Sequence, residues 1–130
     1  MKFGYTIVYV ESVPTTLEFY RAAFGFETRF LHESGQYGEL ETGATTLAFA
    51  SHAMGELNLG SRYQRIDAEA DPLGVELAFV TDDVAAAYER ALGAGARSLH
   101  APARKPWGQT VAYVQASDGS LIELCSPMGG

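Results

Sequence analysis

An internal repeat constrains the fold of this chain more than any other feature of the sequence. A run rich in aromatic and β-branched residues at positions 5–10 leads into a helix-like pattern, and the same order begins again about 71 residues later, at positions 75–80. The turns into the two helices also correspond, at residues 11–13 and 82–84. The repeat predicts one supersecondary unit that is used twice.

In the first copy the strand is followed by one helix and three further strands. Ser12 is suited to cap a helix whose first turn holds Pro14 and which ends at Gly25. One face of that helix is apolar, and turn residues divide the next stretch into three strands. The helical face consists of Val13, Leu17, Tyr20 and Phe24, and the strands are expected at residues 26–32, 36–41 and 45–51.

The second copy repeats this plan. It has a helix over residues 84–92, which Gly93 and Gly95 end, and then strands near 97–100, 109–115 and 120–126. Residues 53–74 are polar and without clear periodicity, so we interpret them as a linker loop. We therefore predict an α+β fold in one domain over residues 1–130, with two βαβββ modules, about 1–52 and 75–128, paired into a curved mixed sheet.

Each module covers one sheet face with its helix and leaves the other face bare, so we expect two modules to pair and form a cleft. Since strand side chains alternate, the last strand should direct Glu123 into the cleft, and Ile122 and Leu124 toward the helix. The same alternation gives the other residues that should face the cleft: Tyr5, Ile7, Tyr9, Thr46, Ala48, Ala50, Glu76, Ala78 and Val80.

Composition excludes some functions. The formal net charge of -7, from 16 acidic and 9 basic residues, does not favour nucleic-acid binding, which needs a basic face. Cys125 is the only cysteine, so no internal disulfide is expected and a reducing compartment is favoured. The N-terminal apolar run stops at Glu11, too early for a signal peptide, and no run has membrane-spanning length. We expect a cytoplasmic protein with no membrane partner.

The order of the motifs resembles the vicinal oxygen chelate superfamily, which includes glyoxalase I, extradiol dioxygenases, fosfomycin-modifying enzymes and bleomycin resistance proteins. The segments that carry the resemblance span nearly the whole chain: residues 10–13, 19–21, 24–26, 79–84, 106–109, 117–120 and 121–124. The C-terminal segments are the most specific. The resemblance implies the paired-module fold of this superfamily.

Enzymes of this superfamily typically hold a divalent metal with a His from the first strand of each module and a Glu from the last strand of one or both. The resemblance maps the His positions onto Tyr5 and Glu76, and the Glu positions onto Ala48 and Glu123. Two carboxylates without imidazole make a poor Zn²⁺, Fe²⁺ or Ni²⁺ site, although with water they could hold Mg²⁺ or Mn²⁺. We therefore predict no metal cofactor, with Glu76 and Glu123 as weak candidate ligands.

The histidines do not form a metal site of their own, because their spacing matches no metal-ligand pattern. They fall in predicted loops or at strand ends, where we expect exposure to solvent: His32, His52 and His100.

Our leading hypothesis is a small-molecule binding protein that resembles the bleomycin resistance proteins and sequesters an aromatic or cationic compound in a metal-free cleft. Aromatic rings would supply contact area, and carboxylates would fix a cationic group. The resemblance also implies a homodimer. The candidate ligand-binding residues are Tyr5, Tyr9, Ala48, Glu76, Trp107, Tyr113 and Glu123.

Alternatives remain open at this point. The chain could be a lyase, such as a glyoxalase-like one, an isomerase or a dioxygenase-like enzyme, which uses a divalent metal or the pair Glu76 and Glu123 as acid and base. It could also serve mainly as a dimeric partner module. Trp107 could instead anchor its turn, and the modules could pair within one chain or across a dimer.

Overall fold

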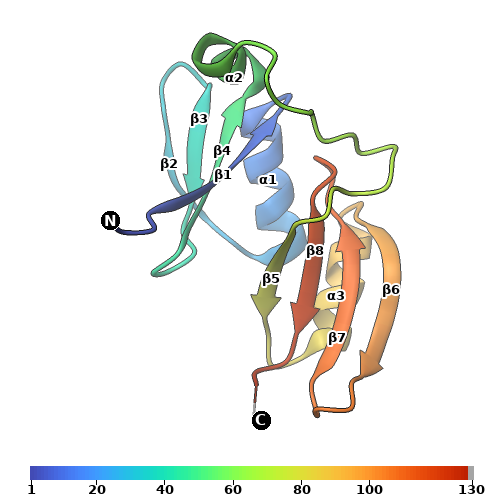
Figure 1. Ribbon diagram of the computed structural model, residues 1–130. Coiled ribbons are helices and arrows are strands. Elements are labelled where there is room, and N and C mark those ends of the chain that lie inside the picture. Colours follow the sequence, from blue (N-terminus) through green and yellow to red (C-terminus); the bar gives the residue numbers. More distant parts are fainter. Residues whose placement is uncertain (129–130) are drawn as a thin grey trace. The chain divides into compact units, whose positions relative to one another are not determined.

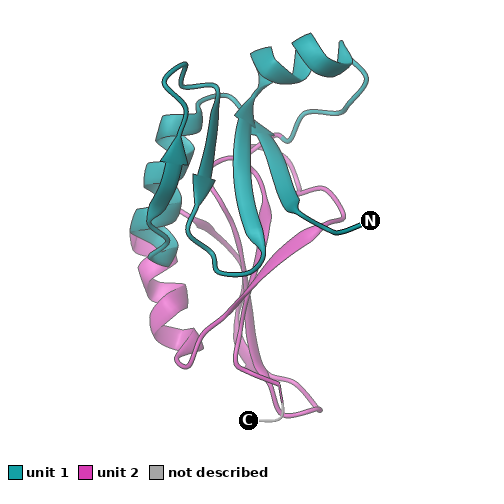
Figure 2. Cartoon of the chain, turned by 90° about the vertical axis from the view of Figure 1, so that its left-hand side faces the viewer, with its two compact units in different colours: residues 1–66 teal, residues 67–130 magenta. Residues whose placement is uncertain are grey.

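The computed structural model describes residues 1–128 and divides the chain into two compact units, Met1–Ile66 and Asp67–Gly130 (Figure 2). Each unit contains one four-stranded sheet with a long helix on it, and each is described by itself below (Figure 1).

The first unit is a mixed sheet in the order β1-β4-β3-β2, in which β1 runs parallel to β4 and the other pairs are antiparallel. Its elements are β1 (Tyr5–Val10), α1 (Val13–Phe24), β2 (Thr28–Leu31), β3 (Tyr37–Leu40), β4 (Thr46–Ser51) and α2 (His52–Leu59).

The second unit has the same topology, in the order β5-β8-β7-β6 with β5 parallel to β8. Its elements are β5 (Glu76–Val80), α3 (Val84–Gly93), β6 (Arg97–Arg104), β7 (Thr110–Gln115) and β8 (Leu121–Cys125). The α+β fold with two βαβββ modules is thereby confirmed.

The core of the first unit lies between α1 and its sheet. The Ser12 side chain accepts the Thr15 amide at 3.3 Å, as expected of an N-cap, and Gly25 ends the helix with a left-handed φ of 81°. Tyr20 is fully buried, and its ring centroid lies 4.8 Å from that of Phe49 on β4. The predicted apolar face of this helix is therefore the face that packs.

The core of the second unit is built in the same way. Asp83 caps α3 by accepting the amide of Ala86 at 3.0 Å, and Val84, Tyr88 and Ala91 are buried. The Tyr88 hydroxyl lies 2.6 Å from the hydroxyl of Ser98 on β6, so the ring is packed and its polar end is satisfied.

Two expectations about local structure were wrong. Part of the expected linker loop forms α2, whose N-cap Ser51 accepts the Met54 amide at 3.1 Å. Leu57 and Leu59 on this helix are exposed, which explains why no single-faced apolar pattern was visible. Strand β6 continues to Arg104 rather than ending at residue 100, and it tolerates Pro102 because it is an edge strand.

The histidine expectation also needs correction at one position. His52 is not an exposed loop residue: it opens α2 and is only 6% exposed. His32, just after β2, and His100, within β6, are exposed as expected. Within residues 1–128, no helix combines the length and the apolar character needed to cross a membrane.

Candidate functional site

The strand register places the repeat-related positions in equivalent places in the two sheets. Ala48 pairs with Ile7 in the first unit, and Glu123 pairs with Ala78 in the second. Two residues earlier on the respective first strands lie Tyr5 and Glu76. The equivalence of the positions is therefore supported by backbone pairing as well as by the sequence repeat.

In the second unit, three of the predicted site residues meet on one face of the sheet, across the neighbouring strands β5, β8 and β7 (Figure 1). Tyr113 pairs with Glu123, and its hydroxyl donates a hydrogen bond of 2.9 Å to Glu123 Oε1. Glu76, on the neighbouring strand β5, lies close enough to Glu123 for the charge of Glu123 to raise the pKa of Glu76. We call Glu76, Glu123 and Tyr113 the carboxyl cluster.

The carboxyl cluster contains two groups whose pKa values are raised. Desolvation and the nearby charge of Glu123 raise the pKa of Glu76, although its side chain is exposed. The hydrogen bond to Glu123, together with burial, raises the pKa of Tyr113 to about 12, so that hydroxyl stays a donor at neutral pH. Glu123 is thus the acceptor of the Tyr113 hydrogen bond and the charge that acts on Glu76.

Cys125, on the same strand face as Glu123, joins this group. Its side chain is buried, and burial together with the nearby charge of Glu123 raises the pKa of its thiol. A buried protonated thiol is a weak donor and a poor nucleophile. Cys125 therefore does not supply a reactive thiolate to the cluster.

The carboxyl cluster has no counter-cation of its own. Among residues 1–128, neither Glu76 nor Glu123 forms an ion pair with a lysine, arginine or histidine. Two adjacent carboxyl groups without a cation can relieve their repulsion by holding a proton or by binding a positively charged group.

The residues at these positions do not fit the metal centre that the superfamily resemblance implies. Ala48 offers no donor atom, and neither Tyr5 nor Glu76 supplies imidazole. Across residues 1–128, no cluster of three or more His, Cys, Asp or Glu side chains has an arrangement that could hold a metal ion. We derive no chemistry through a metal here.

The corresponding face of the first unit carries a neutralised network that sequence reasoning missed. The Tyr37 hydroxyl donates to Glu39 Oε2 at 2.8 Å, and Arg29 donates to Glu39 Oε1 at 3.0 Å and to the hydroxyl of Thr46 at 2.8 Å. Glu39 lies opposite Ala48 in the register. The alternation of Tyr37 and Glu39 along β3 was the available signal.

The predicted residues of the first unit take different environments. Tyr5 is 56% exposed, whereas Ala48 is fully buried. Tyr9 stacks on Tyr63 at 4.9 Å between ring centroids, and the hydroxyl of Tyr63 lies 2.8 Å from Nδ1 of His52. Tyr9 and His52 therefore hold the segment after α2 in place.

Trp107 lies in the turn between β6 and β7 and is not part of the carboxyl cluster. Its indole N–H donates to Gln109 Oε1 at 2.7 Å, and Gln109 in turn donates to the carbonyl of Ser126 at 2.8 Å. The ring is 62% exposed. This geometry anchors the turn while it leaves an aromatic surface open to solvent.

The wild-type protein is expected to lose stability as the pH rises and Glu76 ionises, and the Glu76→Gln variant should not show this loss. Because the pKa of Glu76 is raised in the folded state, its contribution is favourable below the ordinary glutamate pKa and is lost as the pH rises through the raised value. The free energy of unfolding of the variant should therefore exceed that of wild type at pH 7 and approach it at pH 4. Urea unfolding at several pH values between 4 and 7 measures the difference, with the exposed Glu89→Gln as control. The prediction is contradicted if the free energies of unfolding of wild type and Glu76→Gln change in the same way with pH.

Comparisons with known proteins agree with this architecture. Residues 3–129 match the profile of the glyoxalase-like domain family. None of the curated proteins compared with the chain matches it significantly.

Solved structures share the fold at low sequence identity. A glyoxalase-related enzyme from Fulvimarina pelagi has a TM-score of 0.81 at 18% identity, over 98% of this chain and 88% of its own. A glyoxalase/bleomycin resistance protein/dioxygenase family enzyme from Burkholderia phytofirmans has a TM-score of 0.79 at 21% identity, over 97% and 98% of the two chains. A protein of unknown function from Agrobacterium tumefaciens has 0.78 at 26%, over 98% and 95%.

Proposed function

This chain belongs to the glyoxalase-like domain family, and we propose that it is a small-molecule binding protein that sequesters an organic cation on the sheet face of its second unit. The observation that carries the proposal is the placement of Glu76 and Glu123 on one face of the neighbouring strands β5 and β8, with no cationic partner for either among the described residues. A bound cation would relieve the repulsion between the two carboxylates.

The surroundings of the carboxyl cluster suit a ligand that also carries an apolar or aromatic part. Ala78 and Val80 follow Glu76 on the same face of β5 and are exposed, Val80 at 66%. The exposed ring of Trp107 is a candidate contact in the same unit. Contact of the ligand with Tyr5, Tyr9 and Ala48, which belong to the first unit, stays part of the prediction.

The proposal also includes an oligomeric state and a cellular location. The homodimer implied by the superfamily resemblance would be measured by light scattering at several protein concentrations. A cytoplasmic location agrees with the single cysteine, a buried thiol that forms no disulfide.

Benzyltrimethylammonium, benzyl alcohol and benzoate form a matched set of probes, since they share the ring and differ in charge. The cation is expected to raise the Tm, whereas the neutral and anionic probes should not. Its affinity should rise with pH through the raised pKa of Glu76, because binding then displaces fewer protons. Calorimetry in buffers of different ionisation enthalpy counts the protons released.

Variants localise the binding. Glu76→Gln and Glu123→Gln should each weaken binding of the cation about tenfold or more, since each removes a charge-assisted contact. Glu89→Gln, on the exposed side of α3, should bind like wild type. Equal affinity for benzyl alcohol and the cation, or unchanged affinity in both cluster variants, contradicts the proposal.

A second candidate function is metal-free acid–base catalysis, which the raised pKa of Glu76 favours. A protonated Glu76 beside the acceptor Glu123 could donate and withdraw protons on one substrate. The two functions differ in the fate of the bound compound: proton NMR would find a sequestered ligand unchanged after prolonged incubation with the protein, and a substrate converted.

A further inference from the structure

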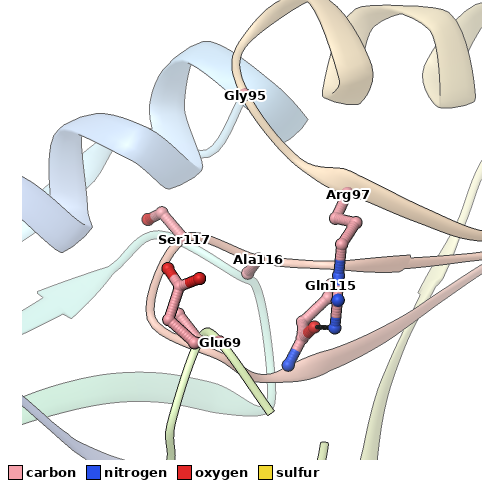
Figure 3. Close-up of a pocket in the computed structure, with 7 residues that line it drawn as sticks. Glu69, Gly95, Arg97, Gln115, Ala116 and Ser117 are labelled. Carbon is pink, nitrogen blue, oxygen red and sulfur yellow. Dashed lines mark hydrogen bonds between the residues drawn. The ribbon is translucent and has the colours of Figure 1, made fainter. Parts of the chain in front are cut away.

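A pocket lies in the second unit, apart from the carboxyl cluster. It is a pocket of about 290 Å³ formed by the segment before β5, the start of β6 and the turn after β7 (Figure 3). Its size is at the lower limit of small-molecule pockets, so it suits a compact ligand. The lining residues are Ala68, Glu69, Gly95, Arg97, Gln115, Ala116 and Ser117.

The Gln115 side chain forms hydrogen bonds with each of the segments that line this pocket. It is 2% exposed, and its Nε2 donates to the carbonyls of Ala70 and Gly119, both at 3.0 Å. Its Oε1 accepts a hydrogen bond from the Arg97 guanidinium, drawn as the dashed line in Figure 3. Arg97 Nη2 also lies 3.4 Å from the carbonyl of Ala70. The guanidinium is therefore held in place by neutral acceptors.

Two opposite charges in this pocket lack ion-pair partners. Within residues 1–128, neither Arg97 nor Glu69 forms a salt bridge. Figure 3 shows Glu69 and Ser117 toward one side of the pocket and Arg97 with Gln115 toward the other. A guanidinium with unused N–H groups is a good receptor for a carboxylate, and a carboxylate for an ammonium group.

We propose that this pocket binds a small zwitterion of the free amino acid class. The ligand carboxylate lies on Arg97, its ammonium group lies on Glu69, and the Ser117 hydroxyl offers a further hydrogen bond. The site is independent of the carboxyl cluster, and its occupant differs from the organic cation proposed for that cluster.

Titration of ¹⁵N-labelled protein with L-alanine, acetate and methylammonium tests this proposal. L-alanine is expected to shift the amide signals of Arg97, Ala116 and Ser117, and to bind more tightly than either single-charge probe. Arg97→Gln and Glu69→Gln should each weaken L-alanine binding about tenfold or more. Arg97→Lys keeps the charge but loses the planar fork, so its affinity should lie between those of wild type and Arg97→Gln.

Matched controls separate this site from general charge effects. Arg104→Gln on β6 and Glu89→Gln on α3 change exposed charges that do not line the pocket, and Glu76→Gln changes only the carboxyl cluster. All three should bind L-alanine like wild type. Acetate that binds as tightly as L-alanine, an unchanged affinity in Glu69→Gln, or the absence of any shift in these amides overturns the proposal.

Discussion

Replacing Tyr20 with alanine is expected to lower the free energy of unfolding by about 3–5 kcal/mol, the range for removal of a buried aromatic side chain. The Tyr20 ring is fully buried between α1 and the first sheet, with ring centroids of Phe49 at 4.8 Å and Phe24 at 5.3 Å. The cavity would lie at the centre of the contact that joins helix to sheet. Chemical denaturation of wild type and variant measures the loss.

Two further variants show whether the loss comes from the buried ring. Tyr20→Phe keeps the ring and should retain most of the stability. Leu57→Ala removes an apolar side chain that is 79% exposed in the same unit, so it should change stability by about 0.5 kcal/mol or less. A Tyr20→Ala loss no larger than that of Leu57→Ala would contradict the packing described here.

The features that sequence alone predicts well are those with a strong local cause. Ser12 and Gly25 bound α1 because a hydroxyl cap and a left-handed glycine are what helix ends require. Alternation along β8 correctly separates Glu123 from the buried Ile122 and Leu124. In the second unit the N-cap rule carries over to Asp83, whereas α3 includes Gly93, one residue beyond its predicted end, and has a right-handed Ala94 as its C-cap.

Sequence reasoning failed where tertiary contacts decide the outcome. His52 is buried because Tyr63, eleven residues later, stacks on its ring and bonds its Nδ1. The Arg29 network joins side chains from β2, β3 and β4, and no short-range pattern specifies such a meeting. The pocket beside Gln115 likewise depends on chain segments that are 45 residues apart.

Within the candidate site, the residue types and the strand face could be predicted from the sequence, whereas the side-chain contacts could not. Alternation places Glu76 and Glu123 on one face, and their register across β5 and β8 brings the two carboxyl groups together. The hydrogen bond from Tyr113 depends on how β7 pairs with β8, which hairpin length alone does not fix. Its aromatic ring makes Trp107 a candidate ligand contact beside the carboxyl cluster, yet Trp107 lies in a turn, where its indole N–H has its own partner, Gln109.

Gln115→Leu is expected to lower the free energy of unfolding by about 1–3 kcal/mol, the cost of leaving a buried polar group without a partner. The carbonyl of the buried Gly119 would lose its hydrogen bond, whereas Ala70 is exposed, so its carbonyl can bind water instead. Arg97 would also lose the acceptor that holds its guanidinium. Urea unfolding measures the loss. The control is the same substitution at an exposed position, Gln64→Leu.

The place at which Gln115→Leu loosens the structure is a stricter test of the role of Gln115 than the total loss of stability. Because Gln115 joins the β7–β8 turn to the segment before β5, amide hydrogen exchange in Gln115→Leu should accelerate near Gly119 and Ala70. Exchange in the core of α3 should change less, since Tyr88 and Ala91 keep their packing. Acceleration spread evenly over the second unit would mean that Gln115 acts through general stability and not as the tie between these two segments.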